Sequence, residues 1–197
     1  GLITLTDVKK AIDYVKETTG RELDFHELGY EDPGTYDLIG SGDTDAVFQL
    51  ESPGMKRFMR DLKPTTFEDI IAGISLYRPG PMDSIPDYIR NKHNPDDIKY
   101  DHPLMEPILS NSYGVMIYQE QVMQVCRNLG GFSFGQADIV RRAMGKKNVE
   151  EMDRQKKIFV FGGVDEKGRK IDGAIARGVP EETAVKIFDR MAEFAKY

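Results

Sequence analysis

The chain has 197 residues, a formal net charge of −6, 40% hydrophobic and 30% charged residues, and one cysteine, Cys126. This length allows one large domain or two small ones with a buried core, and the composition is that of an ordinary globular protein. A lone cysteine excludes an intrachain disulfide, and no apolar run approaches the roughly 20 residues that a membrane-spanning helix needs. No signal peptide opens the chain, so we expect a cytoplasmic protein with no membrane partner. Both ends look cut, which favours a piece of a longer polypeptide.

The first half of the chain predicts short helices separated by loops. Apolar residues recur at helical spacing, and side chains that cap helix starts precede most of these runs. The expected elements are a helix at 5–19, a helix from Pro33 to about Gly40 after Asp32, a short strand or one helical turn at 46–50, a helix from Pro53 to Leu62 after Ser52, a helix after Thr66, a rigid loop at 77–82 and a short helix to about His93.

The second half continues the same pattern. The expected elements are a polar loop at 94–101, a helix at 103–110, a strand or extended run at 113–117, helices at 118–129, 134–144 and 148–160, a Gly-rich loop or small hairpin at 162–178 and a last helix from Pro180. Ser133 with Gln136, and Asn148 with Glu151, have the spacing of capping boxes. The sequence therefore predicts a mainly α fold: an irregular multi-helix domain of about eight to nine helices with one or two short strands or hairpins.

The densest charge cluster contains Arg141, Arg142, Lys146 and Lys147, with Asp138 as the only nearby acid. Four cations this close together on an acidic chain favour a polyanion site. The two arginines also fall in the last turn of an expected helix, where cations complement the helix dipole, so a purely stabilising role stays open. Because adjacent helical residues point about 100° apart, one arginine can brace a carboxylate while the other meets a ligand.

A second group of cations surrounds the Pro-rich loop. Arg78 lies between Tyr77 and a Pro-Gly-Pro run that stiffens the backbone, and a stiff loop loses little entropy on binding. Arg90, Lys92 and His93 end the following helix. Their position also fits dipole compensation, and the residues alone favour that interpretation slightly.

The start of the helix at 118–129 offers weaker candidates. Tyr118 could stack on a base, although a tyrosine in this position is more often part of the core. Gln119 and Gln121 could donate to phosphate or sugar, although glutamine is common on protein surfaces. The three histidines show no metal-ligand spacing with one another or with Cys126, and no phosphate-binding glycine motif is present. The residues therefore predict a helical module with one or two polyanion sites and no catalytic centre of its own.

Six blocks in the same order resemble the bacterial DNA polymerase III alpha subunit, the replicative C-family polymerase. They read SGDTDAVFQLESPGM, LKPTTFEDIIA, LYRPGP, RNKH, YGVMIYQEQVMQ and RRAMGKK, at 41–55, 62–72, 76–81, 90–93, 113–124 and 141–147. The resemblance implies that 1–40 is the end of the palm with connector helices, and that 41–197 is a fingers region truncated at its C-terminus. The insertion-like run at 161–178 looks longer than the usual connector of the family.

The resemblance also implies a function. The whole enzyme adds dNTPs to a DNA 3′ end with Mg²⁺ held by palm aspartates, which would lie outside this chain, so we expect no catalytic or metal-binding residue here and no activity from the chain alone. Arg141, Arg142, Lys146 and Lys147, with Arg78, would bind the dNTP triphosphate. Arg90, Lys92, His93, Tyr118 and Gln119 would contact primer-template DNA or the nascent base pair. Other replicase subunits, such as the sliding clamp, would bind outside this chain.

Two other interpretations stay open from the residues. A free-standing helical nucleic-acid-binding or assembly module would have no part in catalysis. A purely structural helical domain would show no salt-sensitive binding to primer-template DNA.

Overall fold

The computed structural model describes residues 3–24, 27, 29–145, 148–165 and 167–194. These residues form ten α-helices, slightly more than the eight to nine predicted, and the predicted mainly α class is confirmed. The helices are α1 (Ile3–Thr19), α2 (Pro33–Ser41), α3 (Pro53–Leu62), α4 (Phe67–Leu76), α5 (Ile85–His93), α6 (Glu106–Leu109), α7 (Gln119–Asn128), α8 (Phe134–Gly145), α9 (Val149–Phe161) and α10 (Glu181–Phe194). Short 3₁₀ turns join several of them, at Pro81–Ser84, Pro95–Asp97, Pro103–Met105, Ser110–Ser112 and Ile175–Arg177.

The structure settles three regions for which the sequence left alternatives. Residues 46–50 form turns, with positive φ at Ala46 and Gln49, and residues 115–118 are extended with no strand partner in the described part of the chain. The Gly-rich region holds a small hairpin in which β1 (Gly163–Val164) pairs antiparallel with β2 (Lys170–Ile171).

Local capping explains why most helices begin where they do. The side chains of Asp32, Ser52, Thr66 and Asn148 each accept a hydrogen bond from a backbone amide in the first turn of the helix that follows. Ser133 likewise accepts from the Gln136 amide at 3.3 Å. The capping boxes expected at Ser133 and Asn148 are only half formed. The side chains of Gln136 and Glu151 turn toward Gln155 instead, with Gln136 Nε2 at 3.5 Å from Gln155 Oε1 and Gln155 Nε2 at 2.7 Å from Glu151 Oε1.

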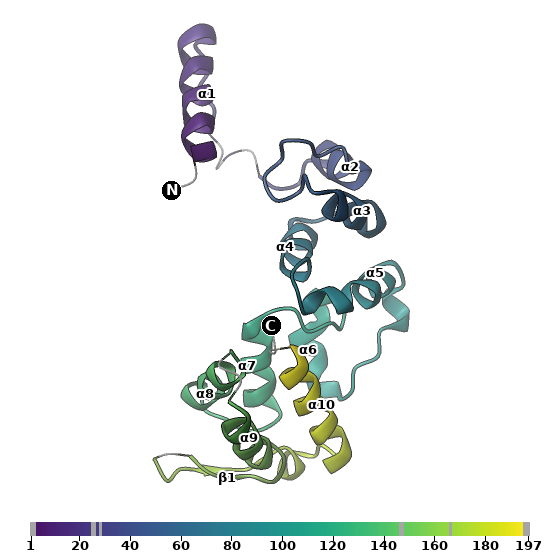
Figure 1. Ribbon diagram of the computed structural model, residues 1–197, viewed down its shortest axis with the longest axis vertical. Helices are drawn as coiled ribbons and strands as arrows, with labels where there is room; N and C mark the ends of the chain where they lie inside the picture. Colours follow the sequence, from purple (N-terminus) through teal and green to yellow (C-terminus); the bar gives the residue numbers. More distant parts are fainter. Residues whose placement is uncertain (1–2, 25–26, 28, 146–147, 166, 195–197) are drawn as a thin grey trace.

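Two hydrophobic cores divide the molecule. The N-terminal core lies among α2–α5 and the extended run before α7, and it consists of Ile39, Leu50, Met55, Phe58, Met59, Leu62, Ala72, Leu76, Tyr88, Val115 and Ile117. The C-terminal core lies among α6–α10 and includes Val122, Val125, Cys126, Leu129, Val140, Phe159, Ile187, Phe188 and Met191. Figure 1 shows the two groups of helices one above the other, and Tyr118 packs against the N-terminal core just where α7 begins. The start of α7 is therefore the junction between the two cores.

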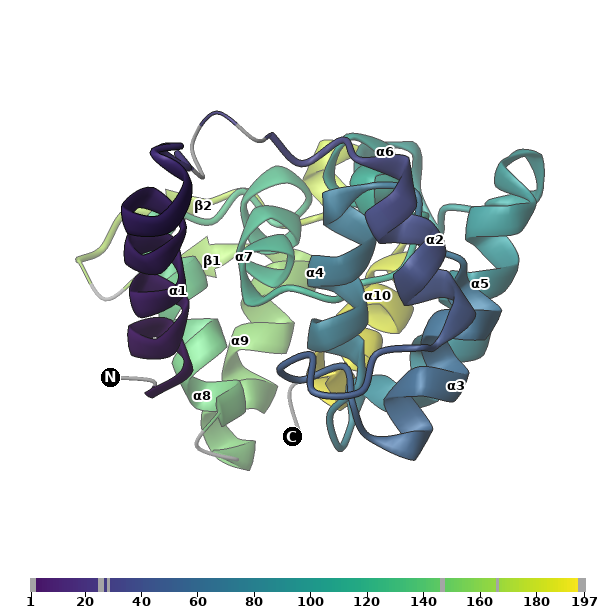
Figure 2. The same ribbon diagram turned by 90° about the horizontal axis from the view of Figure 1, so that it is seen from above.

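Helix α1 stands apart from the other helices in Figure 1, and Figure 2 gives the view from above. Its apolar stripe is uncovered, with Leu5 65% exposed.

Cys126 is fully buried, and burial raises the pKa of its thiol to about 12. Among the described helices, none is both long and apolar enough to cross a lipid bilayer.

Candidate functional site

A buried glutamine fixes the first turn of α7. Gln121 is 4% exposed, and its Oε1 accepts hydrogen bonds from the amides of Ile117 at 2.8 Å and Tyr118 at 3.0 Å. Its Nε2 donates to Ser112 Oγ at 2.7 Å. Both the oxygen and the nitrogen of the Gln121 side-chain amide are hydrogen-bonded, and these bonds fix the backbone at Ile117 and Tyr118. Gln119, two residues before Gln121, is exposed at the surface.

Helix α8 packs against α7 and carries an arginine pair braced by one acid. Arg141 donates from Nε to Asp138 Oδ1 at 2.9 Å, and Arg142 forms an ion pair with Asp138 Oδ2. Arg141 Nη1 also donates to Gln119 Oε1 at 3.3 Å, which joins α8 to α7. We call Asp138, Arg141, Arg142 and Gln119 the Asp138 cluster. Both arginines share one carboxylate, whereas the sequence suggested that only one would brace an acid.

The Asp138 cluster lies at the surface and carries net positive charge. The side chain of Arg142 is 66% exposed and that of Arg141 35%, while Asp138 is 19% exposed. Hydrogen bonds from Arg141 first and Arg142 second hold the pKa of Asp138 below its ordinary value. Asp138 therefore stays ionised at neutral pH, and two guanidinium groups around one carboxylate leave a surplus of one positive charge facing solvent.

Arg78 lies on a shaped loop, as the sequence predicted. Its amide donates to Leu76 O at 2.8 Å, its carbonyl accepts from the Met82 amide at 3.2 Å, and Gly80 adopts φ of 105°, a conformation that favours glycine. Tyr77 anchors the loop. Its ring stacks on Phe58 at 6.3 Å between centroids, and its hydroxyl lies so close to Gly54 that a side chain there would clash. The exposed Arg78 side chain makes no ion pair or hydrogen bond with any described residue.

Lys92 is buried in a network that the sequence did not reveal. Its Nζ lies 2.9 Å from Asp69 Oδ2, and the two side chains are 8% and 1% exposed. The same carboxylate accepts from the amides of Thr65 at 2.9 Å and Thr66 at 3.1 Å, and from the Tyr113 hydroxyl at 3.3 Å. We call these residues the Asp69 network. It ties together α4, α5 and the segment before α7.

The Asp69 network sets the charge state of its members. Burial opposes ionisation of Asp69 most strongly, but the Thr65 amide and Lys92 together outweigh burial and hold its pKa below the ordinary value. Burial and the Asp69 charge raise the pKa of Tyr113 to about 12, and they raise that of Tyr88 further still. The ammonium of Lys92 is thus committed to Asp69 inside the protein, where it has little access to a ligand.

Arg90, His93 and Tyr118, three further predicted residues, make separate contacts and do not join the Asp138 cluster. Arg90 Nη1 pairs with Asp87 Oδ1 at 2.8 Å, and His93 Nε2 lies 3.0 Å from Asp61 O at the end of α3. The half-buried Tyr118 has a raised pKa, caused first by burial. Lys146 and Lys147 fall outside the described residues.

Of the predicted site residues, the structure joins Arg141 to Gln119 by a hydrogen bond and to Arg142 through their shared Asp138, and Tyr118 precedes Gln119 in the chain. Lys92 and Gln121 are buried inside the protein. Asp138 and Asp69 are the supporting residues that sequence reasoning did not single out for a site. The i,i+3 and i,i+4 spacing of Asp138 to the two arginines is a local signal that could have found it. Asp69 and Lys92 are 23 residues apart, and no local pattern connects them.

The fold and the site define a mainly helical domain with an exposed, acid-braced arginine pair. Residues 4–167 match the bacterial DNA polymerase III alpha subunit finger domain, and the chain belongs to this family. This confirms the resemblance carried by the six sequence blocks.

The relatives agree with the family match. The DNA polymerase III alpha subunits of Thermus aquaticus, Halalkalibacterium halodurans and Staphylococcus aureus (strain COL) are 48%, 45% and 42% identical to the chain over its whole length. The chain spans 16–18% of the length of these proteins.

Proposed function

We propose that this chain is the part of a DNA polymerase III alpha subunit that receives the triphosphate of an incoming dNTP and contacts the backbone of primer-template DNA. The observation that carries the proposal is the Asp138 cluster, which presents two guanidinium groups on a finger domain. Guanidinium groups offer paired donors that match phosphate oxygens. Arg78, which has no partner among the described residues, and Lys146 and Lys147 are proposed to assist.

The geometry gives the two arginines different roles. Arg141 is held by Asp138 and Gln119 and is only partly exposed, so it is proposed to fix the position of the cluster. Arg142 keeps most of its guanidinium surface in solvent and is proposed to contact the triphosphate. A cation fixed before the reaction stabilises the negative charge that grows on the leaving pyrophosphate without reorganising.

The chain itself is not proposed to hold the metal ions. In a polymerase of this family we expect Mg²⁺ to activate the attacking 3′ oxygen and stabilise the leaving group, from ligands outside this chain. In the described residues, no group of three or more His, Cys, Asp or Glu side chains could hold a metal ion. We therefore assign no metal-dependent step to these residues, and we propose that the chain alone does not synthesise DNA. Contacts with a sliding clamp are likewise proposed to lie elsewhere.

Arg142→Ala in an alpha subunit that carries these residues tests the proposal. The rate of single-nucleotide incorporation is expected to fall about 100-fold, as when one preorganised charge donor is removed, with little change in primer-template affinity. Rapid-quench kinetics and fluorescence anisotropy measure the two quantities.

The chain provides a matched control for this test. Asp101 also holds two cations at the surface, Lys186 and Arg190 on α10. Arg190→Ala therefore removes an exposed, acid-paired arginine whose side chain is 54% exposed, against 66% for Arg142. It is expected to leave incorporation unchanged. Unchanged incorporation in Arg142→Ala would contradict the proposed role. Lost DNA affinity with an unchanged rate would instead favour a nucleic-acid-binding module without a catalytic role.

A further inference from the structure

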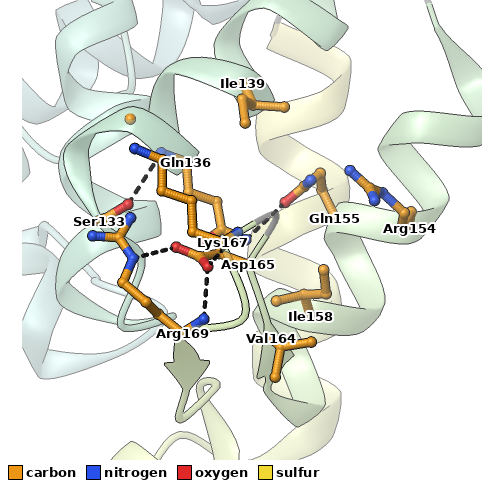
Figure 3. A pocket seen from close by; sticks show the side chains of 11 residues that line it. Ser133, Gln136, Ile139, Arg154, Gln155, Ile158, Val164, Asp165, Lys167 and Arg169 are labelled. Carbon is orange, nitrogen blue, oxygen red and sulfur yellow. Dashed lines mark hydrogen bonds and ion pairs between the residues drawn. The ribbon is translucent and has the colours of Figure 1, made fainter.

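A small, partly open pocket lies along the first half of α8. It has a volume of about 170 Å³ and is lined by the first half of α8, the middle of α9 and the hairpin (Figure 3). An engineered cavity of about 150 Å³ can hold one benzene ring, so this pocket has room for one ring of a ligand. Its apolar lining comes from Ile139, Ile158 and Val164, one from each of the three elements.

The pocket contains a buried acceptor that has no partner. Gln136 is 5% exposed, and its Oε1 makes no hydrogen bond in the structure. Its amide nitrogen is directed at Gln155, which is 1% exposed and in turn bonded to Glu151 (Figure 3). Because a buried polar atom without a hydrogen-bond partner is destabilising, a ligand that donates a hydrogen bond here would gain from satisfying it.

The charges around the pocket favour an anion. Among the described residues, its lining contains three cations, Arg154, Lys167 and Arg169, and one acid, Asp165. Arg154 is paired with Glu151, and Arg169 with Asp165. The Lys167 side chain forms no ion pair with any described residue. The first-turn amides of α8, where Ser133 and Gly135 line the pocket, add the positive end of a helix dipole.

Asp165 does not cancel the preference of the pocket for an anion, because its carboxylate is bonded within the turn of the hairpin. Its carboxylate accepts hydrogen bonds from the amides of Lys167 at 2.9 Å and Arg169 at 2.8 Å, and from Arg169 Nε at 2.6 Å. These bonds hold its pKa below the ordinary value, the Arg169 amide contributing most. The carboxylate is thus engaged by the turn and by Arg169, and the hairpin holds Lys167 beside the start of α8.

We propose that this pocket binds a nucleoside 5′-monophosphate, at a site separate from the Asp138 cluster. The ring-sized apolar space would take the base, Gln136 Oε1 would accept from a base N–H group, and Lys167 with the start of α8 would face the phosphate. No other described feature combines an apolar slot, an orphaned acceptor and an unpaired cation. The inference is independent of the function proposed for the Asp138 cluster.

The test is calorimetric titration of CMP, whose base is a single ring with an amino N–H donor, into an alpha subunit that carries these residues, without DNA or Mg²⁺. We expect CMP to bind. Cytidine lacks the phosphate, and ribose 5-phosphate and inorganic phosphate lack the base, so each is expected to bind at least about tenfold more weakly than CMP. Lys167→Ala and Gln136→Leu are each expected to weaken CMP binding about tenfold. Lys167 is exposed, so its variant keeps the fold, and the thermal unfolding midpoint checks Gln136→Leu.

Two control variants separate the outcomes. Lys170→Ala removes a neighbouring hairpin cation that does not line the pocket, and Arg142→Ala alters the Asp138 cluster; neither is expected to change CMP binding. Loss of CMP binding in Arg142→Ala would place CMP in the polymerase nucleotide site and overturn the inference. The inference is equally overturned if wild type does not bind CMP, if both pocket variants bind it normally, or if inorganic phosphate binds as well as CMP. Lys167→Ala is expected to leave single-nucleotide incorporation unchanged, whereas Arg142→Ala lowers it, so the two proposals fail separately.

Discussion

Two aspartates of this finger domain hold cations in opposite ways. Asp69 lies in the N-terminal core, 1% exposed, and keeps Lys92 buried beside it. Asp138 lies at the surface of α8 and leaves Arg142 largely in solvent. Both carboxyl groups have lowered pKa values. Only the exposed cation, Arg142, has the access to solvent that it needs to exchange its aspartate for a phosphate. Burial, more than charge or sequence motif, therefore separates a cation that stabilises the fold from one that is available to a ligand.

The sharpest test of this contrast is Lys92→Met. It leaves Asp69 ionised and buried without its cation, which is expected to lower the free energy of unfolding by about 3–5 kcal/mol. Urea unfolding followed by circular dichroism measures the loss. Asp69→Asn combined with Lys92→Met removes the stranded charge while keeping an acceptor for the Thr65 and Thr66 amides, and it is expected to recover part of the stability. A loss below about 1 kcal/mol in Lys92→Met would mean that the ion pair behaves like a surface pair.

The pH dependence of stability gives a second test. The folded pKa of Asp69 lies below its value in the unfolded chain, near 3.9. Its stabilising contribution is therefore fully present above that value and is lost as the pH falls through the folded pKa. The urea concentration at the unfolding midpoint of the wild type is expected to decrease as the pH is lowered below about 4. The midpoint of Asp69→Asn should decrease less steeply. Asp138→Asn should change the curve less than Asp69→Asn does, because the lowered pKa of Asp138 comes from ion pairs at the surface, which contribute little to stability. If the urea midpoints of all three proteins fell equally steeply with pH, the contrast between the buried Asp69 and the surface Asp138 would be wrong.

The smallest expected change in stability is that of Asp138→Asn at neutral pH. Surface ion pairs contribute about 0–1 kcal/mol, so the free energy of unfolding should change by less than about 1 kcal/mol. In an alpha subunit that carries these residues, nucleotide incorporation should nevertheless slow, because Arg141 and Arg142 lose the acid that positions them. The loss should be smaller than in Arg142→Ala. A stability loss as large as that of Lys92→Met would show that Asp138 is a structural residue.

Sequence reasoning succeeded here where the cause is local. Asp32 and Thr66 predict helix starts because the side chain of each caps the backbone amide three residues ahead, and both helices begin where they were expected. For the Gly-rich region at 162–178 the sequence left a loop or a small hairpin open, and the structure shows the hairpin. The half-formed capping box at Ser133 marks the limit, since Gln136 has the right spacing but is drawn to Gln155 across the helix pair.

The supporting contacts of the site required the folded chain. Arg141 meets Gln119 across 22 residues of sequence, and Tyr113 meets Asp69 across 44. Such pairs depend on how α7 packs on α8 and how the N-terminal core closes, which no short pattern encodes. The same applies to Lys92, whose position at a helix end also fits an ordinary surface cation. Its burial is decided by Asp69, far away in the sequence.

The buried thiol of Cys126 has a practical consequence for experiments on this domain. It is the sole cysteine of the chain, and a thiol with a pKa of about 12 inside a core forms almost no thiolate at neutral pH. A cysteine introduced on the exposed hairpin, such as Lys170→Cys, would therefore be the one group of this chain that reacts with a maleimide dye. Fluorescent probes could follow the hairpin beside the pocket while the native cysteine stays in place.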